Sequence, residues 1–482
     1  MNLPFSFSED MRSLLGEKEF LELRTALEQE PVASIRLNDA KYSVDRESIS
    51  PDGLQPIPWC REGFYLEERF TYTFDPLFHA SCYYVQEASS MFLGEVIRQQ
   101  IHEPVTALDL CAAPGGKTTH LLQTLSADSL VVANEVNQAR VRTLADNLLK
   151  WGRPNVVVTR NDPADFKGLS GLFDVIVVDA PCSGEGMFRK DKGAVEEWSP
   201  ENVELCCKRQ RRILSDVWQA LKPGGLLIYS TCTYNVRENE ENVKWMCEEW
   251  DARPVEVVVP REWNITGDLT GSDLPVYRFF PSRTRGEGFF MAAVRKEGSL
   301  SEEPDRSMAF SGKKGKKKTS KNKTTSPGPV AARSSMEKAG QWCRLSGMDY
   351  IPVYTGESFG LFPERHAELL NYLEDKLHIL QRGTPVGEWK GRDWIPASIL
   401  PFSILVNTAA FPVYEVTYEQ ALIYLRKEAF PLPGHLPAGY VLVCYREIPL
   451  GFMKNIGNRA NNLYPAEFRI RSSYLPEQIR TL

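Results

Sequence analysis

The stretch that decides the fold is CAAPGGKT (Cys111–Thr118), which directly follows the apolar run VTALDL at residues 105–110. An apolar run that passes through a glycine turn into a helical pattern is typical of the first strand of a nucleotide-binding α/β sheet. The loop therefore raises the question of its ligand, which is ATP, a dinucleotide or another molecule.

Further apolar runs follow the loop, and helical patterns separate them. The runs are VVANE (131–135), VVVTR (156–160), FDVIVVDA (173–180) and GLLIYST (225–231). Continuous apolar character without alternation predicts strands that are covered on both faces. The clearest helix is predicted around 203–221, before KPGG ends it; the residues that fall on one stripe of it are Gln210, Ile213, Leu214, Val217, Trp218 and Leu221. The pattern predicts an α/β fold with a doubly wound parallel sheet.

Polar or reactive residues stand at the end of every predicted strand. In a doubly wound sheet, ligands bind at the carboxyl ends of the strands, so this edge is the expected site. A structural protein has no reason to collect such residues on one edge. In strand order they are Asp109 with the CAAPGGK loop, then Glu135, then Asn161 and Asp162, then Asp179 and Cys182 of DAPCSG, and finally Cys232 of TCT.

The spacing of the glycines narrows the choice of ligand. A P-loop requires glycine where Cys111 stands, and GxGxxG fails because Gly115 and Gly116 are adjacent with no third glycine at the required offset. A glycine turn remains, and Glu135 follows Gly115 by 20 residues, which suits a ribose diol. Asp162 is placed to accept from an adenine amino group. A ribose site and an adenine site without a diphosphate loop predict S-adenosylmethionine as the cofactor.

Each of these residues also has a structural interpretation. Glu135 and Asp162 could be helix N-caps or solvated strand ends, and Lys117 could be a surface residue at the start of a helix. A purely structural role explains either acid alone better than it explains the two acids together at neighbouring strand ends.

Three motifs in this order, ALDLCAAPGGKT, DAPCSGEG and STCTYNVRENEENV, resemble the RNA cytosine-5 methyltransferases of the NOL/NOP/Sun class. The resemblance extends over residues 35–295 and includes SIRLN (34–38) and VQEASSMF (85–92). The chain length, the GEG after DAPCS and the stretch GFMKNIGNRANNLYP look most like the members that modify 16S ribosomal RNA of the small subunit.

The resemblance implies a Rossmann-like class I methyltransferase sheet, with an N-terminal α+β region and a C-terminal PUA-like β domain. It also implies that Cys232 is the nucleophile and that Cys182 is the second catalytic cysteine. The implied methyl-donor site comprises Cys111, Ala112, Ala113, Pro114, Gly115, Gly116, Lys117, Glu135, Asp162 and Asp179.

The chemistry explains the need for two cysteines, because carbon 5 of cytosine is too weak a nucleophile to attack a sulfonium methyl group. A thiolate that adds to carbon 6 makes carbon 5 enamine-like, and the carbon 5 proton must leave before the thiol is expelled. Our hypothesis is that Cys232 attacks, Cys182 assists proton removal, and Asp179 stabilises protonation at ring nitrogen 3. Lys190 is either a contact to the base or phosphate or a surface lysine. Cys206, Cys207 and Cys444 are interpreted as small buried hydrophobes.

The chain divides by composition into successive regions. The segment KKGKKKTSKNK (313–323) is too polar to bury a core and is either a spacer or a phosphate contact. The predicted divisions are an N-terminal RNA-binding region 1–80, a methyltransferase domain 81–298, a lysine-rich linker 299–335, a middle region 336–425 and a PUA-like RNA-binding domain 426–482.

A reactive base must be single-stranded or flipped out, so the RNA has to be held in place. The candidates for holding it are the N-terminal region, the lysine-rich linker and the C-terminal region. AGYVLVCYREIPLGFMKNI (438–456) predicts two strands around a short turn. The basic residues Lys454, Arg459, Arg469 and Arg471 suit phosphate, so deleting this domain is predicted to weaken RNA binding and flatten its salt dependence. The alternative is the mixed surface of an ordinary β domain.

Composition restricts the remaining classes. No apolar run reaches the roughly 18 residues of a membrane span, no metal-ligand spacing occurs, and the cysteines are expected as reduced thiols in a cytoplasmic monomer. His366 and Glu368 form an HxE fragment without the PCxxC of a zinc deaminase. The alternatives kept open are a tRNA substrate, a non-catalytic RNA-binding scaffold and a nicotinamide oxidoreductase.

Overall fold

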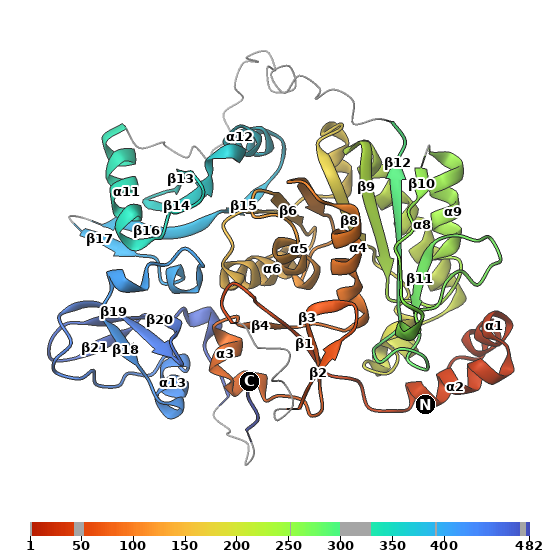
Figure 1. The fold of residues 1–482 in the computed structure, drawn as a ribbon, viewed down its shortest axis with the longest axis horizontal. Helices are drawn as coiled ribbons and strands as arrows, with labels where there is room; N and C mark the ends of the chain where they lie inside the picture. Colours follow the sequence, from red (N-terminus) through yellow and green to blue (C-terminus); the bar gives the residue numbers. More distant parts are fainter. Residues whose placement is uncertain (1, 43–52, 251, 299–328, 391–392, 473–478) are drawn as a thin grey trace.

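Five parallel strands form the centre of the main sheet in a computed structural model of the protein (Figure 1). The structure describes all residues except 1, 43–52, 251, 299–328, 391–392 and 473–478. The central strands lie in the order β9-β8-β5-β6-β7, with parallel pairing throughout, as predicted. Their bounds are β5 (Thr106–Asp109), β6 (Leu130–Asn134), β7 (Val156–Thr159), β8 (Phe173–Asp179) and β9 (Leu221–Thr231).

Antiparallel strands extend this sheet at both edges, so the whole sheet is mixed where the sequence predicted a parallel one. On one side β12 (Phe289–Lys296) pairs with β9, and on the other β15 (Ile379–Arg382) pairs with β7. An apolar run indicates that a strand is buried but not in which direction it pairs. The sequence pattern therefore did not predict the antiparallel pairing of β12. Two short strands complete the edge beside β12, namely β10 (Ala252–Pro254) and β11 (Val276–Phe279).

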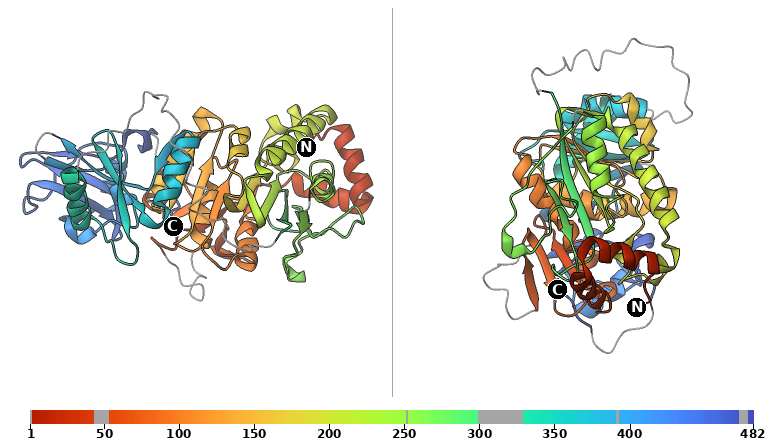
Figure 2. Two further views of the ribbon diagram at one scale, coloured as in Figure 1. Left: turned by 90° about the horizontal axis from the view of Figure 1, so that it is seen from above. Right: turned by 90° about the vertical axis from the view of Figure 1, so that its right-hand side faces the viewer.

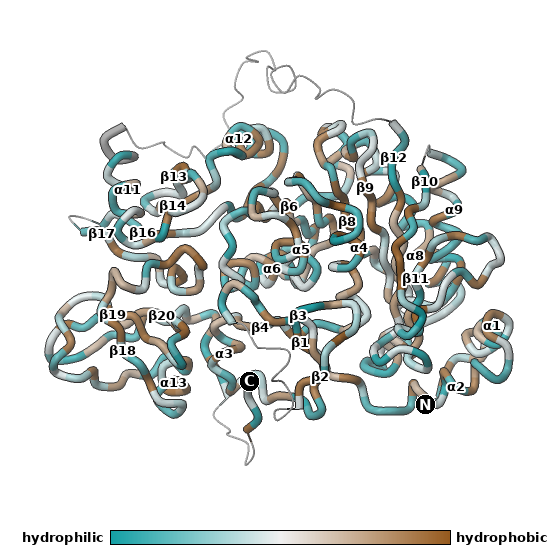
Figure 3. Tube along the Cα trace, in the orientation of Figure 1, coloured by the Kyte–Doolittle hydropathy of each residue, from teal (hydrophilic) through white to brown (hydrophobic). Residues whose placement is uncertain are grey.

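Helices cover both faces of the sheet, which confirms the doubly wound arrangement. Two separate apolar cores result, one on each face, and hydrophobic residues run along the central strands (Figure 3). The predicted stripe is buried on α8 (Pro200–Trp218), but this helix ends at Trp218 and Leu221 already belongs to β9, so the predicted end at 221 was three residues too late. One face holds α4 (Phe92–Gln100), α5 (Gly116–Thr124) and α6 (Gln138–Trp151); the other holds α8 (Pro200–Trp218), α9 (Glu240–Glu249) and α12 (Ala367–Lys376).

The N-terminal region is α+β, as predicted. Its first two helices pack through Phe7 and Leu23 against Phe188, Trp198 and Tyr234 of the methyltransferase domain. These helices therefore brace the segments that follow β8 and β9. The elements are α1 (Phe5–Leu15), α2 (Glu17–Leu27), α3 (Pro76–His79) and a sheet in the order β2-β3-β1-β4, made of β1 (Ser34–Leu37), β2 (Leu54–Ile57), β3 (Cys60–Leu66) and β4 (Tyr83–Val85).

Two four-stranded sheets form the C-terminal half, at the end of the molecule opposite α1 and α2 (Figure 2). The predicted hairpin is present as β19 (Gly439–Tyr445) and β20 (Ile448–Asn455). Its sheet also includes β18 (Val413–Glu415), which the prediction places in the middle region. The remaining elements are α11 (Pro329–Trp342), β13 (Tyr350–Thr355), β14 (Ser358–Pro363), β16 (Thr384–Lys390), β17 (Asp393–Pro396), α13 (Tyr418–Leu425) and β21 (Ala460–Asn462).

The predicted lysine-rich linker falls almost entirely outside the described residues. Its lysine run, 313–323, lies in the undescribed range 299–328, and its last residues, 329–335, form the start of α11. None of the described helices meets the length and apolarity that crossing a membrane requires.

The N-terminal and C-terminal regions share one apolar core. Ile35 and Leu77 lie in the same cluster as Val443, Leu450 and Tyr464. The chain end returns to α3 (Figure 1), where the Leu482 amide donates to Asp75 Oδ2 at 3.0 Å. The last sheet is thus part of the same folded body as the first one.

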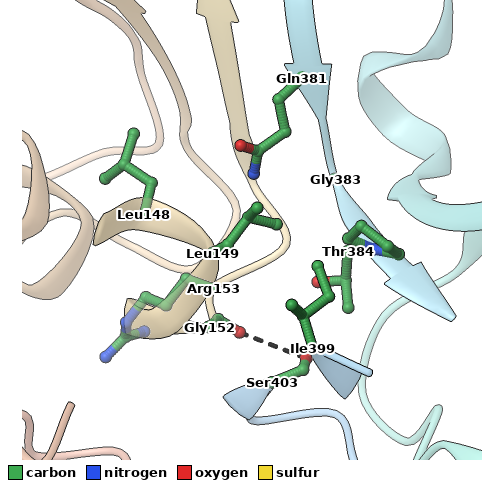
Figure 4. Close-up of a pocket in the computed structure, with 10 residues that line it drawn as sticks. Leu148, Leu149, Gly152, Arg153, Gln381, Gly383, Thr384, Ile399 and Ser403 are labelled. Carbon is green, nitrogen blue, oxygen red and sulfur yellow. Dashed lines mark hydrogen bonds between the residues drawn. The ribbon is translucent and has the colours of Figure 1, made fainter. Parts of the chain in front are cut away.

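A pocket lies at the contact between α6 and the C-terminal half (Figure 4). Gly152 ends α6 with φ +89°, and its carbonyl accepts hydrogen bonds from Ser403 Oγ at 3.3 Å and from the Ile404 amide at 3.1 Å. A Cβ at Gly152 would meet Phe402 O at 2.2 Å, so this close approach requires glycine. The pocket contains none of the predicted site residues; it is lined by Leu148, Leu149, Gly152, Arg153, Gln381, Gly383, Thr384, Pro385, Ile399 and Ser403.

A buried histidine in the shared core predicts a pH dependence of stability. His79 Nε2 donates to Thr73 O at 2.9 Å, Nδ1 accepts from Tyr464 Oη at 3.3 Å, and burial lowers the pKa of His79 to about 4. An unfolded histidine titrates near pH 6.5, so between about 6.5 and 4 only the unfolded chain binds the proton. The stabilisation from neutral His79 is therefore complete above about pH 6.5 and is lost as the pH falls, by up to about 1.4 kcal/mol per pH unit.

We expect His79→Gln to lower stability at neutral pH but to flatten this loss. The measurement is the free energy of unfolding in urea at about pH 7.5 and about pH 5 for both proteins, and the difference between them isolates His79 from other titrating groups. An unchanged slope in the variant would contradict the assignment.

Candidate active site

The two predicted catalytic cysteines meet at the carboxyl edge of the sheet. Cys182 follows β8 and Cys232 follows β9, and these strands are parallel neighbours with Asp179 opposite Ser230. The two sulfurs are 3.1 Å apart, and the Cys232 amide donates to Cys182 Sγ at 3.3 Å. Both side chains are partly exposed. The hydrogen bond with Cys232 and burial together hold the pKa of Cys182 well above its usual range, so Cys182 is a protonated thiol in this state.

Lys117 and Asp179 form an ion pair beside the sulfurs. Lys117 Nζ lies 2.8 Å from Asp179 Oδ2, and Asp179 Oδ1 accepts from Ser230 Oγ at 2.7 Å. Burial lowers the pKa of Lys117, but Asp179, with smaller contributions from Asp109 and Cys232, outweighs it and leaves the pKa raised. The Lys117 side chain is only 14% exposed, so it is not the surface residue of the alternative interpretation.

The glycine turn is held from both sides. Gly115 has φ +114°, a conformation that favours glycine, and Gly116 begins α5. Asp109 Oδ2 accepts from Thr118 Oγ1 at 2.6 Å, and Pro114 O accepts from Asn147 Nδ2 at 2.8 Å. Burial raises the pKa of Asp109 to about 7. The loop therefore presents the N-terminus of α5 to the same edge as the cysteines.

The two acids predicted for the cofactor stand at the next strand ends. Glu135, after β6, is buried, accepts from the Asn137 amide at 2.9 Å, and lies 3.3 Å from Arg140. Asp162, after β7, accepts from the Ala164 amide at 3.0 Å as the N-cap of a short 3-10 helix, so its structural interpretation applies. Its side chain is 44% exposed, which leaves it accessible to a ligand.

A pair of buried glutamates, which the sequence did not reveal, ties the two cysteine loops together. Glu185 Oε2 accepts from the Tyr234 amide at 2.7 Å and from the Asn235 amide at 2.9 Å. Glu238 Oε2 accepts from the Ser183 amide at 3.1 Å. These bonds join the segment after β8 to the segment after β9. Both residues lie inside the motifs GEG and RENEEN, but only the fold shows which amides they reach.

A buried arginine supports the glycine turn from the N-terminal sheet. Arg36 of SIRLN donates to Thr119 Oγ1 at 2.6 Å and to Gly116 O at 3.4 Å, and its guanidinium lies 4.7 Å from the Trp151 ring. Burial lowers the pKa of Arg36 to about 10. Arg36 of the SIRLN motif thus supports the glycine turn and the start of α5.

Lys190 and the three cysteines predicted to be buried lie in contacts that belong to the fold. Lys190 Nζ lies 3.5 Å from Glu287, which also pairs with Arg189 at 2.9 Å. Cys206, Cys207 and Cys444 are buried, as predicted. Among the described residues, no three His, Cys, Asp or Glu side chains are grouped as a metal site would require.

Models of three known protein families match different parts of the chain. The profile described as "16S rRNA methyltransferase RsmB/F" matches residues 97–295. The profile of the "N-terminal domain of 16S rRNA methyltransferase RsmF" matches 3–88, and that of the "Methyltransferase RsmF PUA domain" matches 411–470.

Similar proteins extend over nearly the whole chain. "Ribosomal RNA small subunit methyltransferase F" of Pectobacterium carotovorum is 32% identical over 97% of this chain and 96% of its own length. The protein of the same name from Escherichia coli O9:H4 is 33% identical, covering 95% and 94%.

Two solved structures share the fold. A methyltransferase homologue from Pyrococcus horikoshii is 30% identical with a TM-score of 0.52, covering 60% of this chain and 94% of that one. NSun6 from Pyrococcus horikoshii with SFG is 22% identical with a TM-score of 0.52, covering 61% and 99%.

Proposed function

The chain belongs to the family of ribosomal RNA small subunit methyltransferase F, and on this premise we propose that it transfers a methyl group from S-adenosylmethionine to carbon 5 of a cytosine in 16S rRNA. The observation that carries the proposal is the 3.1 Å separation of the Cys182 and Cys232 sulfurs beside the Lys117–Asp179 pair. One chain supplies all of these groups, so we propose that the protein acts as a monomer. We also propose that it acts in the cytoplasm, where ribosomes assemble.

The residues around the glycine turn fit S-adenosylmethionine. Asp109 Oδ1 is a buried carboxylate oxygen without a hydrogen-bond partner among the described residues, which suits a ligand that carries positive charge. Glu135 and Asp162 stand at the next two strand ends, where a ribose and an adenine would be held. When bound, the cofactor supplies an electrophilic methyl group.

Cys232 is the nucleophile in this proposal. Its thiolate adds to carbon 6 of the cytosine, and the Lys117–Asp179 ion pair lies at the same edge of the sheet. Asp179 stabilises a proton at ring nitrogen 3, because its carboxylate already lies at the same strand ends. These two interactions make carbon 5 reactive toward the methyl group.

Cys182 then releases the product. Its sulfur lies 3.1 Å from that of Cys232. Cys182 gives up its thiol proton to solvent and, as a thiolate, takes the carbon 5 proton. Loss of that proton restores the ring double bond and expels the Cys232 thiolate.

Methyl transfer with isotope-labelled S-adenosylmethionine tests the proposal. Purified 16S rRNA, small subunits and tRNA are incubated separately with the enzyme, and the digested nucleosides are analysed by mass spectrometry. We expect labelled 5-methylcytidine from 16S rRNA or the small subunit. Label in tRNA alone would select the alternative substrate, and no label in any RNA would favour the scaffold alternative. A thermal shift with NAD but not with S-adenosylmethionine would favour the oxidoreductase.

Exposed arginines of the last domain are proposed to hold the RNA backbone. Arg459, Arg469 and Arg471 are exposed, so replacing them leaves the core intact. We expect the triple alanine variant to bind 16S rRNA more weakly. Its salt dependence should decrease by up to about one unit of log–log slope for each phosphate group that an arginine no longer neutralises. The check is a titration at several salt concentrations. A variant with an unchanged slope would assign RNA binding to another surface.

A further inference from the structure

The two sulfurs at the active site lie close enough to react with each other. Their 3.1 Å separation is about 1 Å longer than the roughly 2.05 Å of a disulfide bond. Cys182 and Cys232 are both free thiols and both are partly exposed. The adjacent pair Cys206 and Cys207 is buried, and those sulfurs face oxygen atoms of other residues instead.

We propose that Cys182 and Cys232 form a reversible disulfide on exposure to a peroxide, so that oxidation switches the active site off. The peroxide is the oxidant, and a small thiol reverses the reaction. The blocked state follows because Cys232 can no longer add to a pyrimidine, a consequence that rests on the proposed function.

The reaction is balanced with hydrogen peroxide as the co-reactant. The Cys232 thiolate attacks one peroxide oxygen, the O–O bond breaks, and the departing hydroxide takes a proton, which leaves a sulfenic acid and one water. The Cys182 sulfur then attacks the Cys232 sulfur, forms the S–S bond, and expels hydroxide, which leaves as the second water with the Cys182 proton. Two thiols are oxidised by two electrons in total, and one peroxide is reduced to two waters.

The surroundings favour both steps. Cys232 is partly exposed, so a peroxide can reach its sulfur. The Glu185 and Glu238 hydrogen bonds hold the two loops against each other, so Cys182 stays within reach of an oxidised Cys232. A nearby second thiol protects the first from further oxidation, because it resolves the sulfenic acid before a second peroxide reacts.

Peptide mass spectrometry tests the bond directly. The full-length protein is treated with hydrogen peroxide, its remaining thiols are blocked under denaturing conditions, and it is digested with trypsin. The peptides 168–189 and 213–237 each contain a single cysteine, Cys182 and Cys232 respectively. We expect these peptides joined with the loss of two hydrogens, and separated again by dithiothreitol. Peroxide-treated protein in which both cysteines still take the blocking reagent would overturn the proposal.

Two variants sharpen the result. Cys247→Ser removes a partly exposed thiol on α9 and should form the bond as the wild type does. In Cys182→Ala, Cys232 has no resolving partner and should take up two oxygens instead of forming a reversible bond. Reversible oxidation of Cys232 with a different cysteine as partner would also contradict the proposal. Because the readout is protein mass and needs no RNA, its failure leaves the methyl-transfer proposal standing, and the reverse also holds.

Discussion

Cys232→Ala is expected to abolish methyl transfer, by about four orders of magnitude or more, and to form no covalent complex with RNA. The reason is that carbon 5 becomes reactive only after a thiolate adds to carbon 6, and in this site Cys232 is the proposed source of that thiolate. The variant should keep its fold, since the side chain is small and partly exposed. Activity is measured as labelled 5-methylcytidine, and the fold is checked by thermal melting.

Cys182→Ala is the matched variant and should behave differently. Addition of Cys232 to the base remains possible, but proton removal from carbon 5 loses its proposed base, so the protein–RNA adduct should accumulate. The adduct is detected as a slow-migrating band of labelled RNA on a denaturing gel. Cys247→Ser serves as the control that should retain activity without an adduct. An adduct formed by Cys232→Ala but not by Cys182→Ala would reverse the two roles.

Leu450→Ala is expected to destabilise the whole protein by about 2–5 kcal/mol. Leu450 is fully buried on β20, in the cluster that also contains Ile35 of β1 and Leu77 of α3. The cavity left by the smaller side chain therefore weakens the N-terminal region and the last domain together. Ile456→Ala, at a position that is 41% exposed, is the control and should change stability by less than about 0.5 kcal/mol.

The measurement is the free energy of unfolding, followed with separate probes in the two regions. We expect both regions to lose stability in Leu450→Ala. Destabilisation confined to the last domain would show that the shared core does not couple them.

The shared core also changes how RNA binding should be tested. Deletion of the last domain, predicted from the sequence to weaken RNA binding, would remove Leu450 and Tyr464 from that core and destabilise the N-terminal region. Weaker binding by a truncated protein would then report unfolding as much as the removal of RNA-binding side chains. The exposed arginine variants separate the two effects.

Much of the site was readable from the sequence because its residues follow strand ends. Buried parallel strands are continuous apolar runs, and the residues after them must meet at one edge of the sheet. Cys182 and Cys232 are 50 positions apart in the chain but occupy neighbouring strand ends. The resemblance to a methyltransferase family added the roles of these residues, which spacing alone did not supply.

Other features depended on pairings that no local pattern records. The antiparallel edges β12 and β15, the Glu185 and Glu238 bonds and the joint core of the two terminal regions all bring together segments that are distant in the chain. An apolar run specifies burial without specifying its partner, and a glutamate in a motif does not show which amide it will meet.

The sequence by itself determined the central strands, the glycine turn and the reactive residues at the strand ends, because these follow from periodicity and spacing within short segments. Only the tertiary structure decided that two sulfurs lie 3.1 Å apart, that Lys117 pairs with Asp179, and that the first and last sheets share a core. Side-chain distances and shared burial arise when separate segments pack, and packing selects one partner among many that the local sequence allows.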